Sequence, residues 1–409
     1  MLTPYVDVLR RPGAFRMSST GFLARFPMAM IGIGEVLLVS AQTGSYALAG
    51  ALSATGALAN AVFGPLLGRA TDRYGQSRVT SILVAVHVVT LTAFIVLVRE
   101  SAPTWVLVVA VTLSGGSFPN LGALVRSRWA FLLAGDPPAL RTAFAFESVL
   151  DEVIYVLGPP IATVLAVSVV DFGALAAVAV LLVVGSVLFL RARDTEPPAG
   201  GTSRRGEGSA LRFPGVISVT LAFVFLGGLF GAFEVVTVAF ADEAGVRGWT
   251  GLLLGLYALA SGTSGVVLGA VHMRMPMHRQ LLVFSGLMAL ATVPFPFLTS
   301  PWWIGAQCLL AGLAVSPVLI NGFALIERLV PNARMTEGLV WTNTGIGVGI
   351  AIAAALAGSV IDARGASTAY WICVVSAVLT FLVVLVSTPT LSRAWVTAHA
   401  SPEDDVVGA

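Results

Sequence analysis

GRATDRYGQSR, residues 68–78, places three arginines and one aspartate between two long apolar runs of the chain. The runs on either side, about 46–68 and 79–98, contain no charged side chain. Charged side chains are costly inside a lipid bilayer and stable at its surface. The segment is therefore expected to mark a turn between two membrane-crossing helices.

The composition of the whole chain indicates an integral membrane protein. Hydrophobic residues make up 57% and charged residues 11% of its 409 residues, whereas charged residues make up about a quarter of a typical soluble domain. The net charge of +2 is small and the arginines are dispersed, so binding to nucleic acid is not expected. The two cysteines, Cys308 and Cys373, lie in apolar runs and match neither a disulfide framework nor a metal site. We expect no metal and no cofactor.

Twelve apolar segments emerge when the chain is divided at its charged and Pro/Gly-rich interruptions. A helix needs about 20 apolar residues to cross a bilayer, and lipid cannot hydrogen-bond an unpaired backbone. The predicted fold is therefore all-α. The predicted spans are 18–41, 46–68, 79–99, 104–125, 142–168, 172–191, 214–240, 249–271, 280–299, 302–326, 335–360 and 367–388.

The arginines predict how the chain is oriented. Cytoplasmic loops retain positive charge, and with the amino terminus inside, only Arg99, Arg247 and Arg364 fall on the outer side. The first 20 residues lack the apolar core and cleavage site of a secretory signal. We expect both termini in the cytoplasm, with the protein in a cell membrane of the bacterial inner-membrane type.

A polar segment divides the spans into six and six. Residues 192–213 are rich in Pro, Gly, Ser and charge, so they cannot bury enough apolar surface to fold alone. The sequence predicts an N-terminal six-helix bundle over 1–191, a cytoplasmic linker over 192–213, a C-terminal six-helix bundle over 214–390 and a cytoplasmic tail over 391–409.

Three short matches, in the same order, relate the two halves. GEVLLVS at 34–40 resembles FEVVTVA at 233–239, GALVRSR at 122–128 resembles GFALIER at 322–328, and VVDFG at 169–173 resembles VIDARG at 360–365. The series indicates a duplicated six-helix unit with pseudo-symmetric halves, as in transporters whose substrate site lies between repeats. Glu35 and Glu234 then occupy matching places in the first and seventh spans.

The polar turn carries a resemblance to a known family. Gly68, Asp72, Arg73, Gly75 and Arg78 resemble the signature G-x-x-x-D-[RK]-x-G-[RK]-[RK] of the major facilitator superfamily, in the loop after the second span. Gln76 and Ser77 depart from that pattern.

From the residues alone, Gly68 is expected to end the second helix and Gly75 to permit a tight reversal. Asp72 is expected to cap a helical turn or to pair with an arginine. The resemblance implies a latch that holds the two bundles together on the cytoplasmic side. The alternative is that Arg69, Arg73 and Arg78 only enforce topology.

Among the carboxylates inside predicted spans, Glu35, Asp151, Glu152 and Glu234 are the candidates for function. Each costs roughly 2.5 to 3.5 kcal/mol at mid-bilayer on insertion scales, so each is expected to face a partner, a cavity or a proton path. The first and seventh helices line the central cavity in the superfamily. By that resemblance Glu35 and Glu234 are candidates for proton coupling or substrate binding, and the alternative is a structural hydrogen bond.

The fifth span holds several acidic groups close together. Glu147, Asp151 and Tyr155 share one helical face, and Glu152 points about 100° away. Glu147 is expected to pair with Arg126, Arg128 or Arg141. For Asp151 and Glu152, a coupling role and a structural role both remain open.

The same span continues into Gly158-Pro159-Pro160. Proline kinks a helix because it removes a backbone donor, so Gly158 and Pro159 are expected to form a helix bend. The segment resembles the core of the antiporter motif of drug exporters in the superfamily, without that motif's flanking glycines.

Together these features predict a secondary active transporter of the drug and metabolite proton antiporter branch, and no enzyme. The expected activity is proton-coupled efflux of a small amphiphilic or cationic compound, with protons as the coupling ion. The alternative is proton-coupled uptake of a small metabolite. The expected partners are this substrate and membrane lipid, and the protein is expected to be a monomer.

Overall fold

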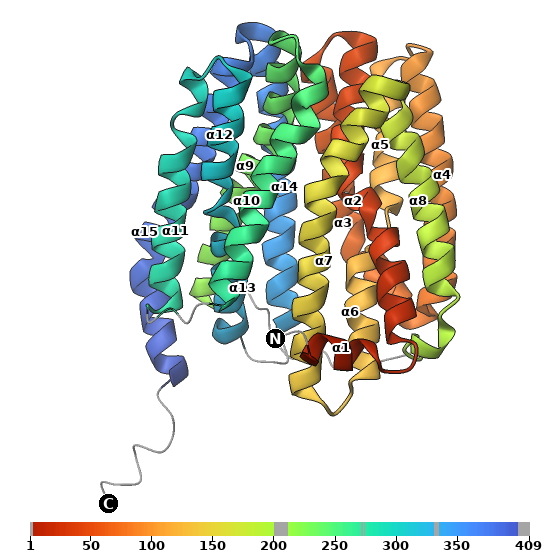
Figure 1. The fold of residues 1–409 in the computed structure, drawn as a ribbon, viewed down its shortest axis with the longest axis vertical. Helices are drawn as coiled ribbons and strands as arrows, with labels where there is room; N and C mark the ends of the chain where they lie inside the picture. The colour runs from red at the N-terminus through yellow and green to blue at the C-terminus, as the bar shows by residue number, and fades with distance from the viewer. Residues whose placement is uncertain (1–2, 200–211, 271–272, 274, 331–334, 400–409) are drawn as a thin grey trace, which may run out of the picture.

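The computed structural model describes residues 3–199, 212–270, 273, 275–330 and 335–399, and in this part of the chain it is an all-helical bundle. Twelve helices or helix pairs are long and apolar enough to cross a membrane (Figure 1). The first described helix, Thr3–Leu9, and the carboxyl end of the last one, Ala366–His399, lie at the same end of the bundle. We call this the inner end, and the opposite one the outer end.

The first six spans follow a short helix near the amino terminus, α1 (Thr3–Leu9). They are formed by α2 (Ala14–Thr43), α3 (Tyr46–Tyr74), α4 (Gln76–Arg99), α5 (Thr104–Ser117) with α6 (Leu121–Leu132), α7 (Pro137–Val164) with the π-helical turn η1 (Leu165–Val169), and α8 (Gly173–Leu190). A 3₁₀ turn, η2 (Arg193–Thr195), follows α8.

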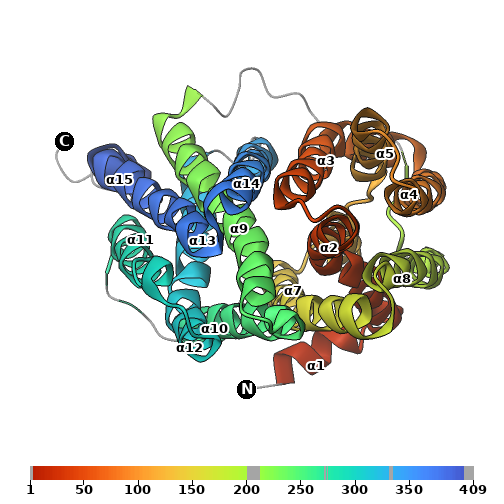
Figure 2. The ribbon, with the colours of Figure 1, turned by 90° about the horizontal axis from the view of Figure 1, so that it is seen from above.

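The last six spans begin at α9 (Pro214–Glu243). They continue through the turn η4 (Arg247–Trp249) and α10 (Thr250–Ala270), α11 (Met277–Thr292) and the turn η5 (Phe295–Phe297), α12 (Pro301–Gly312) with α13 (Val315–Leu329), α14 (Met335–Arg364) and α15 (Ala366–His399). In the view along the bundle, helices α2–α8 lie on one side and α9–α15 on the other (Figure 2). They meet where α3 packs on α14 and where α7 packs on α10.

Each of the twelve predicted spans overlaps one observed span, so the predicted fold class is confirmed. The predicted ends near 191 and 214 fall beside the end of α8 and the start of α9. Residues 200–211 of the predicted linker and 400–409 of the predicted tail lie outside the described residues.

The expectation that Gly68 ends a helix is wrong. Helix α3 runs on to Tyr74, and the chain reverses at Gly75, which has a φ of 92°. Arginine is a good helix former, so the polar residues that end the apolar run do not end the helix. The reversal needs the positive φ that glycine adopts readily.

The fourth and tenth spans are each made of two helices. In the fourth, the helix breaks at Phe118-Pro119-Asn120, where proline supplies no backbone donor. Asn60 of α3 donates its side-chain amide to the carbonyls of Gly115 (3.3 Å) and Phe118 (3.2 Å), and Asn120 caps α6 by accepting from the Ala123 amide at 3.1 Å. The tenth span also breaks, between Gly312 and Val315. Interrupted helices in corresponding spans of two halves are a mark of transporter repeats.

Candidate functional site

Glu35 of α2 and Glu234 of α9 interact with one another, and each lies in the outer half of its helix. Glu35 is 4% exposed, its carboxylate is hydrogen-bonded by Ser53, and it interacts electrostatically with Glu234. A glycine lies against each carboxylate, and Gly32 leaves space that a side chain would take from Glu234. A Cβ atom at Gly56 would lie 3.6 Å from both Glu35 oxygens, and one at Gly32 would lie 2.9 Å from Oε1 of Glu234.

Neither carboxylate is in an ion pair with an arginine within the described residues. Buried charges are costly unless they are paired, and two nearby negative charges also repel each other. A bound proton or a bound cation would relieve both costs. The arrangement is therefore chemically suited to exchanging one for the other.

Glu152 of α7 reaches from the first half of the chain to the second. Its Oε1 accepts a hydrogen bond from the Ser316 hydroxyl of α13 at 3.1 Å, and the Ser316 and Ser261 hydroxyl oxygens are 2.8 Å apart. Gly262 of α10 leaves the space that the Glu152 side chain fills. Glu152 thus makes a polar contact between the halves that any relative movement of them must change.

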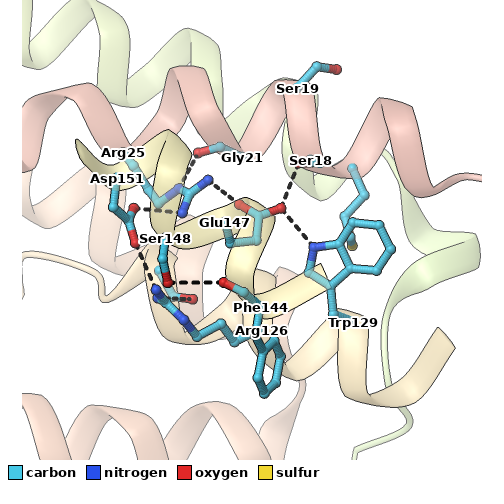
Figure 3. A network of polar contacts seen from close by, with 12 residues as sticks. Ser18, Ser19, Gly21, Arg25, Arg126, Trp129, Phe144, Glu147, Ser148 and Asp151 are labelled. Carbon is cyan, nitrogen blue, oxygen red and sulfur yellow. Dashed lines mark hydrogen bonds and ion pairs between the residues drawn. The ribbon is translucent and has the colours of Figure 1, made fainter. Parts of the chain in front are cut away.

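Arg25 forms the centre of a buried ion-pair network in the first half, near the inner end (Figure 3). Its guanidinium donates to Glu147, to Oδ1 of Asp151 at 2.7 Å, and to the Gly21 carbonyl at 3.1 Å. Glu147 also accepts from the Trp129 indole (2.7 Å) and the Ser18 hydroxyl (2.6 Å). Arg25 is 1% exposed and Glu147 is fully buried, so this network ties α2, α6 and α7 together.

Asp151 lies at the edge of this network. Its second oxygen accepts from Arg126 at 2.7 Å, so Asp151 bridges Arg25 and Arg126. Glu147 is paired with an arginine, as expected, but that arginine is Arg25 and not one of the three that the sequence suggested. Among the four predicted carboxylates, the structure brings Glu35 near Glu234, whereas Asp151 is neutralised twice.

Trp129 and Ser18 are functional partners of this network that the sequence did not single out. Their polar atoms complete the coordination of the buried Glu147 carboxylate. A tryptophan three residues after Arg126 on a short helix was the available signal, since a buried indole N–H needs an acceptor.

The halves contact one another at the outer end through the start of α3. The Asp362 carboxylate of α14 accepts hydrogen bonds from the backbone amides of Tyr46 and Ala47, both at 2.9 Å, and from the Ser45 hydroxyl at 2.8 Å. Ser45 itself accepts from the Leu48 amide at 3.1 Å. The free amides at the start of a helix need acceptors, and here the opposite half supplies two of them.

Further contacts between the halves surround this cap. Arg247 donates to the Leu37 carbonyl (3.2 Å) and the Ser40 hydroxyl (3.1 Å) of α2, and the Tyr46 hydroxyl donates to Asp242 at 2.8 Å. The α3–α14 contact includes Tyr46, which lies against Gly358, and Ala61, near the middle of α3, which lies against Gly347. In the described residues the halves are therefore joined from the outer end to the middle of the bundle.

The signature residues lie at the inner end, away from these contacts. Asp72 and Arg73 are exposed on the last turn of α3, and Asp72 makes no hydrogen bond or ion pair with any described residue. The residues that depart from the signature are the engaged ones. Gln76 accepts from Arg128 at 2.9 Å, and Ser77 donates its amide to Glu196 at 2.7 Å.

Gly158 and Pro159 lie where α7 is packed on both sides. A Cβ at Gly158 would lie 2.7 Å from Cβ of Ala29 on α2, and one at Gly251 of α10 would lie 2.8 Å from the Pro159 carbonyl oxygen. Helix α7 continues through both prolines, and its regular geometry changes one turn later, at the π-helical turn η1. The bend at Gly158 and Pro159 stays a prediction.

Comparison with known proteins supports this reading of the fold. Residues 17–343, most of the chain, match the family model described as Major Facilitator Superfamily. No curated protein sequence matches the chain.

Several solved structures are similar. A mutant of the nucleoside transporter NupG has a TM-score of 0.70 at 12% identity, covering 92% of this chain and 99% of its own. The peptide transporter POT in complex with sulfate has a TM-score of 0.70 at 15% identity, covering 93% and 95%. The human organic anion transporter TETRAN has a TM-score of 0.61 at 15% identity, covering 91% and 99%. At these identities the likeness concerns the fold alone.

Proposed function

Because the chain belongs to the major facilitator superfamily, it is a secondary transporter and not an enzyme, and we propose that it exports a small amphiphilic or cationic compound in exchange for protons. We expect it to act as a monomer in a cell membrane, with its inner end and both termini in the cytoplasm. The drug and metabolite proton antiporter branch is part of this proposal.

The observation that carries the proposal is the carboxylate pair of Glu35 and Glu234. They come from matching places in the two halves and have no arginine partner within the described residues. A cationic substrate entering between the halves would neutralise the pair, and so would protons. Competition between these two occupants couples export of the cation to proton entry.

The one buried arginine of the first span is not free to bind an anion. The Arg25 guanidinium donates hydrogen bonds to Glu147, to Asp151 and to the Gly21 carbonyl. An anionic substrate would have to break a buried network, which costs several kcal/mol. This favours a cation over an anion at the site.

The closed outer end fits the alternating-access mechanism, in which two six-helix bundles rock against each other around a central site. With the inner end in the cytoplasm, the described contacts correspond to an inward-facing state. We propose that the signature residues Gly68, Asp72, Arg73, Gly75 and Arg78 latch the opposite, outward-facing state, which agrees with Asp72 having no partner among the described residues. The hydrogen bond from Ser316 to Glu152 joins the halves, so it would break when the halves move apart at this point.

The charge class can be tested by thermal-shift measurements on purified protein. We expect tetraphenylphosphonium and ethidium to stabilise the protein, and tetraphenylborate, uridine and a neutral dipeptide to have little effect. Flux of the stabilising cation is then measured in proteoliposomes under an imposed pH gradient. Cation movement against the direction of proton flow supports antiport, and movement in the same direction would replace it with uptake.

Glu35→Gln tests the site, with Glu100→Gln as the matched control. Glu100 is exposed just beyond the end of α4, away from the carboxylate pair. We expect Glu35→Gln to abolish proton-driven cation flux and Glu100→Gln to preserve it. Undiminished flux in Glu35→Gln would remove this residue from the mechanism.

A further inference from the structure

A groove of about 450 Å³ lies on the surface between the start of α4 and the end of α8, away from the Glu35–Glu234 pair and beside the signature segment, with which it shares Arg78. Its polar lining is made of Ser77, Arg78 and Ser81 of α4 with Arg191 and Arg193 just after α8. The two helices are neighbours at the edge of the first half (Figure 2). Since the spans of α4 and α8 begin and end at these residues, the groove sits at the membrane surface.

The three arginines of this groove have no acidic partner among the described residues. None of them makes a side-chain hydrogen bond, ion pair or ring contact with another residue in the part of the chain that the structure describes, and all three are exposed. The acidic residues that follow α8 contact other groups than these arginines. Glu196 is bound to Ser77, and Asp194 and Glu196 both interact electrostatically with the buried Arg128.

Arg128 builds the frame of the groove. Its Nη1 donates to the carbonyls of Phe189 (3.1 Å) and Ala192 (2.7 Å), and its Nε donates to Gln76 of α4 at 2.9 Å. Its guanidinium also stacks over the Phe189 ring at 4.0 Å. A fully buried arginine thus fixes the end of α8 against the start of α4, which leaves the groove arginines free for another ligand.

Each wall of the groove continues into an exposed apolar stripe. On α4, Arg78 is followed on the same helical face by Ile82 (58% exposed), Val86 and Val89. On α8, Arg191 is preceded on one face by Val187 (43% exposed), Val184 and Val180. Both stripes lead from the arginines toward the middle of the membrane. The arginines suit the anionic headgroup of a phospholipid, and the apolar stripes suit its acyl chains.

We propose that this α4–α8 groove binds the phosphate headgroup of an anionic diacyl phospholipid, with its acyl chains along the two stripes. Basic pockets between membrane helices bind anionic headgroups in this way. A zwitterionic lipid carries its own ammonium beside the phosphate, so it neutralises the three arginines less well. The ligand is taken to be a lipid and not free phosphate because the stripes adjoin the arginines.

Native mass spectrometry of the full chain, purified in detergent, tests the proposal with dioctanoyl phosphatidylglycerol as the probe. We expect one such lipid to bind per chain more tightly than dioctanoyl phosphatidylcholine. Each arginine near a surface contributes roughly a factor of five to the attraction of an anionic headgroup. The variant R78Q/R191Q/R193Q should therefore bind phosphatidylglycerol on the order of 100-fold more weakly at low salt.

The matched control removes the same charge from the same end of the molecule. R10Q/R16Q/R212Q changes arginines whose side chains make no hydrogen bond or ion pair with described residues and lie outside the groove. Equal loss in the control, or unchanged binding in R78Q/R191Q/R193Q, would overturn the proposal. A second variant, S81W, fills the groove without changing its charge and should also lose the bound lipid.

The two sources of phosphate are separated by a competition arm. Millimolar inorganic phosphate should not displace the lipid, because it gains nothing from the apolar stripes. Inorganic phosphate is instead the ligand if it displaces the lipid and its own binding is lost in R78Q/R191Q/R193Q. That result would make the groove a phosphate site, and the assignment to lipid would be wrong.

Discussion

Removing the Asp362 carboxylate should open the outer end of the protein. Asp362 of α14 accepts three hydrogen bonds from the first turn of α3 in the opposite half: from the Ser45 hydroxyl and from the amides of Tyr46 and Ala47. The contact acts as a helix cap supplied across the interface. It exists only while the outer end is closed, so its free energy contributes directly to the equilibrium between the two states.

The magnitude follows from the two parts of the contact. A side-chain cap contributes about 0.5 to 2 kcal/mol, and a negative charge at a helix amino terminus about 0.3 to 1 kcal/mol. Together they favour closure by about 1 to 3 kcal/mol, and each 1.4 kcal/mol changes an equilibrium constant about tenfold. Asp362→Ala should therefore shift the equilibrium roughly 5- to 150-fold toward the outer-open state. Asp362→Asn keeps one acceptor and should shift it less.

The shift can be measured as a distance distribution between spin labels by double electron–electron resonance. Cysteines at Glu100 and Thr299 place one label on an exposed outer loop of each half, and the native Cys308 and Cys373 are buried. We expect Asp362→Ala to add a longer-distance population.

Asp171→Ala is the matched control for this measurement. Asp171 also lies at the outer end, but its partner Gln42 belongs to the same half. Its loss should leave the distance distribution unchanged. A distribution in Asp362→Ala equal to that of the unmodified protein, or an equal shift in Asp171→Ala, would show that the Asp362 cap does not hold the outer end closed.

Three further predictions concern packing and the latch. Arg25→Ala leaves the Glu147 carboxylate buried without its cation and should lower the stability of the folded protein by about 3 to 5 kcal/mol, measured as a large drop in Tm; an unchanged Tm would mean that the pair is not buried in the membrane. Asp72→Asn should increase labelling of cysteine probes at the inner end, because it weakens only the outward-facing state, and an unchanged labelling pattern would leave the signature arginines with a topological role alone. Gly50→Val adds a side chain where α3 meets the Ala354 backbone of α14, so it should block closure of the outer end, seen as a longer label distance that Asp362→Ala no longer increases.

The sequence predicted the helices well because lipid imposes a length and a polarity on every span. In the second span, hydropathy does not predict where the helix ends. Hydropathy reports where the chain leaves lipid, at Gly68, whereas the helix ends where its hydrogen-bond ladder ends, at Tyr74. The breaks in the fourth and tenth spans were missed for the same reason: apolar composition continues across them, and only the backbone changes.

The site was predictable in its residue types but not in its pairings. Glu35, Asp151, Glu152 and Glu234 stand out because carboxylates in lipid are rare. Their partners come from distant parts of the chain: Arg25 pairs with Glu147 across 122 positions, and no local spacing signals such a contact. The cap between Asp362 and Tyr46 spans 316 positions and likewise appears only when the helices are packed.

Exchange of protons for a cation at Glu35 and Glu234 can be separated from cation movement alone. In proteoliposomes, proton-driven accumulation of a transported cation is measured beside cation-for-cation exchange at equal pH on both sides. We predict that Glu35→Gln and Glu234→Gln lose proton-driven accumulation and retain exchange, because exchange needs no proton to leave the site. Full proton-driven accumulation in both variants would show that the two carboxylates do not couple cation export to protons.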